Sequence, residues 1–224
     1  MKTESEKTVS LTIHDSEHVF ICGATGSGKS VLADIYCAGM GRVIKLDIKN
    51  DTNARRRKGE PVWRGLVEDE DFQVVTSLEA VKNSEFQKVI FVPNVEEQNV
   101  ELYDELCKYV FEEGDCTLWI DELLLVCESA LRFPRYLKHI MVAGRALNAR
   151  LVACAQRPAT IPGFILANMQ HYFIFSLGQP VDRKRMVETV GNDKLLNNPK
   201  VKYSFYYYKE GQDPETVGVY KLKI

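Results

Sequence analysis

A glycine-rich stretch early in the chain has the residue types and the spacing of a phosphate-binding loop. Gly23-Ala-Thr-Gly-Ser-Gly-Lys-Ser30 fits the pattern G-x-x-x-x-G-K-[ST]. Glycines let the main chain curl until several backbone N–H groups point at one anion, and Lys29 adds a positive charge there. The Ser30 hydroxyl is a suitable Mg²⁺ ligand. An accidental turn is the alternative, but an apolar strand before the loop and a helical pattern after it favour a site for ATP and Mg²⁺.

The residues that this pattern assigns to the nucleotide are Gly23, Ala24, Thr25, Gly26, Ser27, Gly28, Lys29, Ser30 and Val31.

A pair of acidic residues follows a second apolar run, Thr117-Leu-Trp-Ile120. At the end of a strand beside a phosphate loop, an Asp holds Mg²⁺ through water, which suits Asp121. Glu122 is then placed to orient and deprotonate the water that attacks the terminal phosphate. Acidic residues are also common at the start of a helix, which is the alternative. Together with the upstream loop, the pair predicts ATP hydrolysis with Ser30 and Asp121 as the metal ligands.

Gln156 ends a further apolar run that covers residues 150–155, and Arg157-Pro158 then turns the chain away. A side-chain amide at the end of a strand next to the catalytic one can sense the γ-phosphate or hold the attacking water. A polar loop without a role is the alternative. We expect Gln156 to share a site with Glu122.

The composition is that of an ordinary globular protein. The 224 residues are 45% hydrophobic and 27% charged, with a net charge of −2. This balance excludes a globally basic nucleic-acid binder but permits a locally basic surface. The six cysteines form no C-x-x-C pair, so we expect buried, reduced thiols in a cytosolic protein rather than zinc ligands. The sequence shows neither a signal peptide nor an apolar run of about 18 residues.

The apolar pattern predicts strands that alternate with helices. Strands are expected at 8–13, 19–22, 42–48, 72–76, 88–92, 116–120, 150–155 and 171–177. Helices are expected from residue 29 onwards and at 77–86, 99–113, 130–147, 162–169 and 181–190. Segments 202–208 and 218–224 suggest a C-terminal antiparallel β-hairpin. We therefore expect one α/β domain over residues 1–224, with a mostly parallel central sheet covered by helices on both faces.

Several stretches resemble the FtsK/HerA branch of the additional-strand P-loop NTPases, which are RecA-like ATPases that translocate double-stranded DNA. Besides the loop at 23–30, they are Leu46-Asp-Ile-Lys49, Trp119-Ile-Asp-Glu122 and the most specific one, 144–158, with its continuation to Asn168. Residues 181–185 are similar to the stretch after the family's next strand. The resemblance covers roughly residues 18–190. It implies a Walker A loop at 23–30 and a Walker B strand that ends in Asp121-Glu122.

The family completes its site with a polar sensor and an arginine finger, and the resemblance carries these roles to Gln156 and Arg145. Such an arginine acts in trans on the neighbouring subunit's nucleotide and stabilises the transition state. The alternative for Arg145 is a solvent-facing arginine at a helix C-terminus. Arg150 and Arg157 are the other candidates for the finger.

The chain departs from several branches of the family. FtsK and conjugative coupling proteins carry membrane segments, HerA-type helicases carry an N-terminal barrel, and FtsK carries a winged-helix domain. A motor domain of this size without these parts most resembles the genome-packaging ATPases of tailless, membrane-containing icosahedral DNA viruses. The resemblance therefore implies an ATPase that packages double-stranded DNA into a preformed capsid.

A ring motor grips the phosphate backbone of DNA without recognising bases, so its pore loops should be basic. The densest basic run lies in a long polar connection and consists of Arg55, Arg56, Arg57 and Lys58. We expect this run to bind DNA. A solvated loop balanced by Glu60 and the acidic residues at 68–71 is the alternative. The basic run at 183–185 is a second candidate for DNA binding.

The sequence thus favours an ATP-hydrolysing motor that forms a homo-oligomeric ring, a hexamer or a pentamer, around double-stranded DNA. Its expected location is the host cytoplasm or the virion, with a capsid or membrane protein at a packaging vertex as a partner. A cellular or plasmid DNA-transfer or resection translocase is an alternative with the same fold. A nucleotide-gated assembly scaffold and a small-molecule kinase are alternatives of other classes. Glu122 suits an attacking water and so disfavours the kinase.

Overall fold

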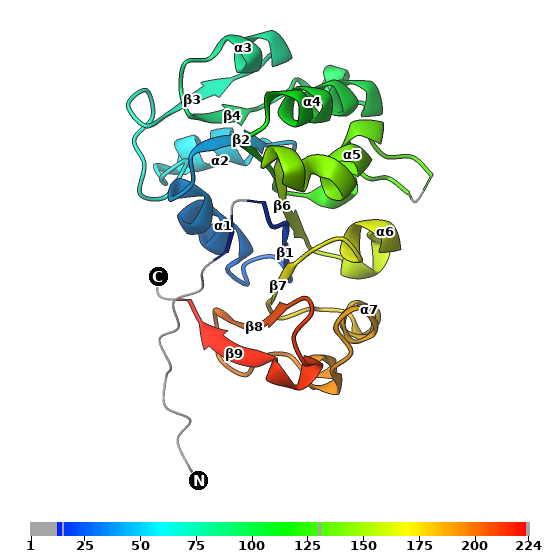
Figure 1. The fold of residues 1–224 in the computed structure, drawn as a ribbon. Helices are drawn as coiled ribbons and strands as arrows, with labels where there is room; N and C mark the ends of the chain where they lie inside the picture. Colours follow the sequence, from blue (N-terminus) through cyan, green and yellow to red (C-terminus); the bar gives the residue numbers. More distant parts are fainter. Residues whose placement is uncertain (1–12, 15, 130, 223–224) are drawn as a thin grey trace.

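A computed structural model of the protein describes residues 13–14, 16–129 and 131–222 (Figure 1). In this part of the chain, nine strands form one sheet in the order β3-β4-β2-β5-β6-β1-β7-β8-β9. The strands are β1 (Val19–Cys22), β2 (Arg42–Leu46), β3 (Phe72–Val75), β4 (Lys88–Phe91), β5 (Cys116–Ile120), β6 (Arg150–Ala155), β7 (His171–Ile174), β8 (Ser204–Lys209) and β9 (Gly218–Lys221).

Helices connect most of the parallel strands. They are α1 (Lys29–Ala38), α2 (Asp51–Lys58), α3 (Leu78–Asn83), α4 (Val100–Glu113), α5 (Arg135–Ala143), α6 (Gly163–Leu166) and α7 (Pro180–Val190). The side chains of Ser77 and Asn99 cap the N-termini of α3 and α4, where they accept hydrogen bonds from Ala80 N at 3.2 Å and Leu102 N at 2.8 Å. No helix in the described part of the chain is long and apolar enough to cross a membrane.

The predicted fold class is confirmed. All pairs among β1 to β7 are parallel, and β8 and β9 add an antiparallel pair at one edge, as the predicted hairpin requires. The strand β6 lies between β1 and β5, so one additional strand separates the strand before the phosphate loop from the strand before the acidic pair. The carboxyl ends of β1, β5 and β6 therefore meet at one edge of the sheet.

The central strands are buried because each face of the sheet carries its own hydrophobic layer. Alternate residues of β1 point to opposite faces, with Phe20 in one layer and Ile21 in the other. Helices α3 to α7 cover the first face, while α1 and the segment around Trp63 cover the second. Figure 1 shows α1 on one side of the sheet and α5, α6 and α7 on the other.

Two predictions about elements differ from the structure, and a third lies almost wholly outside the described residues. The connection that carries the basic run contains the helix α2. The helix expected over 130–147 begins only at Arg135, because Pro134, which cannot donate a backbone hydrogen bond, occupies its N-cap position. After Ala143 this helix continues as a 3₁₀ turn, η3 (Gly144–Leu147). The strand predicted at 8–13 lies outside the described residues except for Ile13, which is not in a strand.

Candidate nucleotide site

The glycine-rich loop leaves β1 and curls back over the carboxyl edge of the sheet before α1 begins. Gly23 has a φ of +157°, and a Cβ there would lie 2.6 Å from the Cβ of Phe175. Gly28 has a φ of +113°, which residues with a side chain rarely adopt. The loop is attached to the segment that follows β7, because Ala24 N donates to Ser176 O at 2.7 Å. The two glycines thus allow the tight, closely packed curl that the sequence pattern predicted.

Lys29 opens α1 and folds its side chain back into the loop. Its Nζ donates to Ala24 O at 3.0 Å, and the residue is 6% exposed. Burial lowers the pKa of Lys29, and the acidic pair at 121–122 only partly opposes this shift. A cation at a helix N-terminus, surrounded by loop amides, is arranged to receive phosphate oxygens.

The acidic pair lies at the end of β5, opposite the start of α1. Ser30 Oγ lies 3.5 Å from Asp121 Oδ1, and Lys49 Nζ lies 2.7 Å from Asp121 Oδ2. Burial alone would raise the pKa of Asp121, but the charges of Lys49 and Lys45 and the Lys49 hydrogen bond hold it below its usual range. Asp121 therefore stays ionised. Ser30 and Asp121 supply the hard oxygen donors that Mg²⁺ prefers, so they fit the predicted metal site.

Glu122 and Gln156 join the same edge from neighbouring strands. Gln156 N donates to Glu122 Oε1 at 3.4 Å, and the Gln156 side chain accepts a hydrogen bond from Thr25 Oγ1 at 3.0 Å. Burial raises the pKa of Glu122, although Lys49 and Lys29 oppose it. A carboxylate with a raised pKa is a better proton acceptor than an ordinary surface glutamate. The structure thus brings the loop, the acidic pair and Gln156 into one site.

The candidate arginines lie in different environments. Arg145 is exposed in η3, which precedes β6 and therefore lies near the amino end of that strand. Six strand residues, about 20 Å, separate this end from the phosphate loop of the same chain. Arg150 is buried, and its Nε donates to Thr117 Oγ1 at 2.7 Å. Arg157 Nε lies 2.8 Å from Asp182 Oδ2. Arg145 therefore lies too far from the phosphate loop of its own chain to contact a nucleotide bound there.

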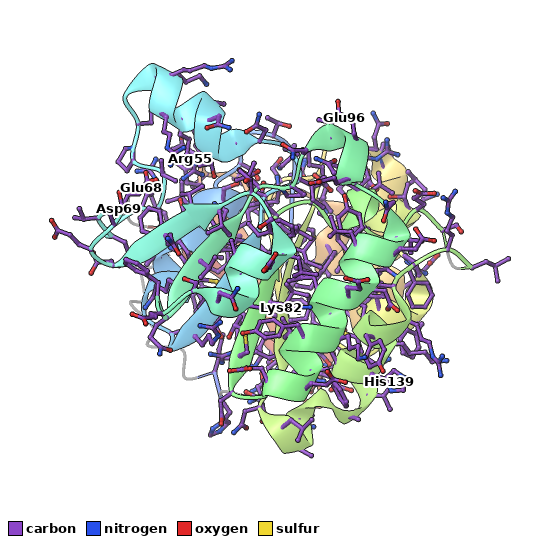
Figure 2. All side chains as sticks on the ribbon, turned by 90° about the horizontal axis from the view of Figure 1, so that it is seen from above. Arg55, Glu68, Asp69, Lys82, Glu96 and His139 are labelled. Carbon is purple, nitrogen blue, oxygen red and sulfur yellow. The ribbon has the colours of Figure 1, made fainter. Side chains whose placement is uncertain are left out.

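The four residues of the basic run separate into two groups on α2. Arg55 Nη1 lies 2.7 Å from Asp34 Oδ2 on α1, and Arg56 pairs with Glu68. Figure 2 shows Arg55 and Glu68 at the same corner of the molecule. Arg57 and Lys58 are exposed at the end of the helix. Arg55 therefore attaches α2 to α1, whereas Arg57 and Lys58 are exposed to solvent.

The site also contains residues that the sequence patterns did not assign to it. Lys49 was recognised only as part of a resemblance, yet it is the ion-pair partner of Asp121. The neighbouring Asp47 caps α2 by accepting hydrogen bonds from Asp51 N at 2.9 Å and Thr52 N at 2.7 Å. Their position after β2, which pairs with β5, was the signal that could have placed them beside Asp121.

Comparison with known proteins reveals relatives in sequence, although no family model matches the chain. The chain is 26% identical over 218 residues to the DNA translocase FtsK of Clostridium tetani, which covers 87% of this chain and 28% of that protein. It is 27% identical over 213 residues to FtsK of Clostridium acetobutylicum, which covers 80% of this chain and 25% of that protein. The chain thus spans about a quarter of the length of these relatives.

Two solved structures share the fold. The genome packaging NTPase B204 from Sulfolobus turreted icosahedral virus 2, in complex with ATP-gammaS, has a TM-score of 0.71 at 16% identity. That match covers 95% of this chain and 100% of B204. The cytoplasmic domain of the Thermomonospora curvata type VII secretion ATPase EccC has a TM-score of 0.56 at 14% identity, over 91% of this chain and 25% of that one. The sequence similarity and the shared fold confirm the predicted likeness to P-loop ATPases of the FtsK/HerA type.

Proposed function

We propose that this chain is the motor domain of an ATP-driven translocase for double-stranded DNA. The observation that carries the proposal is the meeting of the phosphate loop, Asp121-Glu122 and Gln156 at the carboxyl edge of three adjacent strands. These are the parts that phosphoryl transfer from ATP to water requires. The sequence similarity to FtsK supports DNA as the substrate that hydrolysis moves.

In this proposal each residue of the site has one task. The loop amides and Lys29 bind the phosphates, and Ser30 and Asp121 hold the metal ion. Bound Mg²⁺ would neutralise charge on the β- and γ-phosphates. Glu122 accepts the proton of the attacking water, and Gln156 orients this water or senses the γ-phosphate. Arg145 from a neighbouring chain completes the site in a homo-oligomeric ring.

Packaging of a viral genome into a capsid is the more specific function that we favour. The fold shared with B204, which is a genome packaging NTPase, supports it. A capsid or membrane protein at a packaging vertex would then be a further partner. A cellular or plasmid DNA-transfer translocase is the second candidate, which the similarity to FtsK favours.

The test is steady-state ATP hydrolysis over a series of protein concentrations, with and without linear double-stranded DNA. Turnover per subunit that rises with concentration and increases with DNA supports an oligomeric translocase. Hydrolysis that responds to neither variable contradicts the motor and leaves a self-contained NTPase. ATP binding and assembly without hydrolysis would instead indicate a nucleotide-gated scaffold.

A further inference from the structure

We propose that residues 199–204 form the pocket that receives the nucleoside end of ATP, meaning its base and ribose. A cavity of about 320 Å³ lies beside the phosphate loop. Loop residues 24–27 line one side of it, and Ser176 with residues 199–204 lines the other. Small-molecule pockets usually measure about 300–1,000 Å³, so this cavity is large enough to hold part of a small ligand. The inference rests on the proposed nucleotide site, and it adds a pocket for the base and ribose to the loop that binds the phosphates.

The order of the strands fixes which end of a bound triphosphate faces this cavity. Glu122 and Gln156 follow β5 and β6, which lie on one side of β1. The γ-phosphate must face these residues, since water attacks it there. The opposite end of the triphosphate therefore leads towards the other side of β1, where β7 and β8 lie. Ser176 follows β7 and Ser204 begins β8, so the cavity lies where the nucleoside must emerge.

The walls of the cavity suit a nucleoside attached to phosphates. Tyr203 is half-buried, and its Cδ1 lies 3.4 Å from the position that a Cβ on Gly28 would take. This ring provides an apolar wall next to the loop. Lys202 Nζ lies 4.8 Å from the centre of the ring, and Lys200 is also exposed on the rim. The two ammonium groups place positive charge beside an anionic ligand.

The backbone that carries the Tyr203 ring is held in an unusual conformation. Tyr203 has a φ of +63°, a strained conformation for an aromatic residue, and its carbonyl accepts a hydrogen bond from Leu222 N at 3.0 Å. This hydrogen bond fixes the residue whose ring forms the wall of the cavity next to the phosphate loop.

The experiment compares two probes by isothermal titration calorimetry with Mg²⁺: ADP, which has a nucleoside, and inorganic tripolyphosphate, which has none. Tyr203→Gly removes the ring and suits the positive φ. An aromatic contact with a base contributes on the order of 1–3 kcal/mol, so ADP should bind roughly tenfold more weakly or worse. Tripolyphosphate should bind as it does to the unmodified protein. Tyr203→Phe, which keeps the ring, should bind ADP more tightly than Tyr203→Gly does.

Three controls separate the possible failures. Asp69→Gly makes the same change at a φ of +64° on an exposed loop, and ADP should bind it normally. Tyr203→Asn, which tolerates the left-handed conformation, replaces Tyr203→Gly if that variant does not fold. Lys29→Ala should weaken binding of both probes, since it removes the phosphate contact.

The outcomes distinguish the pocket from the site as a whole. Unchanged ADP affinity in Tyr203→Gly, together with weakened ADP binding in Lys29→Ala, overturns the nucleoside pocket and leaves the phosphate site intact. Equal weakening of both probes in Tyr203→Gly also overturns it, because the loop itself would then be damaged. Unchanged ADP binding in Lys29→Ala would contradict the proposed function itself.

Discussion

Asp121 keeps its charge in an almost dry environment because Lys49 stands beside it. The carboxylate is 3% exposed, and its Oδ2 is taken by the Lys49 ammonium group, while Oδ1 faces Ser30. Burying an isolated charge is costly in free energy, so the buried Asp121 carboxylate requires a neighbouring cation. This arrangement keeps Asp121 ionised and leaves one of its oxygens directed at Ser30 of the loop.

The first prediction concerns Glu122 as the base in hydrolysis. Glu122→Gln keeps the size of the side chain but cannot accept the proton of water, so turnover should fall by about 10² to 10⁴-fold. ATP should still bind, because the residues that hold the phosphates are unchanged. Glu105→Gln, on the exposed side of α4, is the matched control and should hydrolyse ATP normally. Retained DNA-dependent turnover in Glu122→Gln would contradict the assignment.

The second prediction concerns the acid stability conferred by Glu17. This side chain lies 2.8 Å from Lys209 Nζ and 2.8 Å from His171 Nε2. Burial would raise its pKa, but the hydrogen bonds from Lys209 and His171 outweigh burial and lower it from 4.5 to about 2. The contribution of Glu17 to stability is therefore present above pH 4.5 and lost as the pH falls through about 2.

Glu17→Gln should accordingly reduce the free energy of unfolding at pH 7 by roughly 1–3 kcal/mol. The loss relative to the unmodified protein should shrink as the pH falls from 4.5 towards 2. Urea unfolding followed by circular dichroism over this pH range measures both effects. A difference that stays constant with pH would show that Glu17 does not act through its charge.

At the scale of single residues, the sequence could predict those that belong to a short motif. The structure adds residues that come close to the candidate site only because the chain folds. The phosphate loop, the acidic pair and Gln156 lie together in the structure, and they could be predicted as a group because residue type and strand position together point to one chemistry. Lys49 belongs to a short stretch that resembles the family, but that stretch does not by itself identify Asp121 as its partner, and no local pattern places Tyr203 beside Gly28. A lysine and a tyrosine in isolation favour no particular role.

At the scale of elements, α2 shows how a helix without an apolar face is held. Ala54 is its one aliphatic residue, so the pattern of hydrophobic residues could not predict it. Polar contacts replace packing: Asp47 caps the first turn, and Arg55 reaches Asp34, a fully buried residue of α1. The helix that follows β2 is thereby attached to the helix that follows the phosphate loop.

The third prediction tests this attachment. Arg55→Ala leaves the buried Asp34 carboxylate with Lys45, 3.6 Å away, as its remaining ion-pair partner among the described residues. The free energy of unfolding should fall by roughly 2–4 kcal/mol. Arg57→Ala, at an exposed position of the same helix, should change it by less than about 0.5 kcal/mol. Urea denaturation of both variants is the measurement, and equal midpoints would show that the Arg55–Asp34 pair does not hold α2.

At the scale of the whole molecule, the catalytic edge and Arg145 lie at opposite ends of the strands. One chain therefore cannot bring its own Arg145 to its own nucleotide without unfolding the sheet. A second copy can do so only if the two ends face each other across an interface. This polarity follows from the parallel topology, which the alternation of strands and helices already indicated. The interface itself could not be predicted, because no sequence pattern marks it.

The fourth prediction uses this polarity. Arg145→Ala should lower turnover by about 10³-fold or more if the arginine acts as a finger. Mixing Arg145→Ala with Glu122→Gln should restore part of the activity, since an intact site on one chain then meets Arg145 on the other. Arg135→Ala, at an exposed position of α5, should behave as the unmodified protein. A mixture as inactive as its two components would exclude action in trans.

The burial of every cysteine has a practical consequence. All six thiols are free and buried, and burial raises the pKa of Cys127 and Cys154 to about 12. Because the thiolate is the reactive form, maleimides should leave the folded protein unlabelled. A single surface cysteine, such as one introduced by Lys58→Cys, can therefore carry a fluorophore without prior removal of the native thiols. Because the native thiols should not react, a fluorophore on the introduced cysteine would report on α2 alone in single-molecule experiments during turnover.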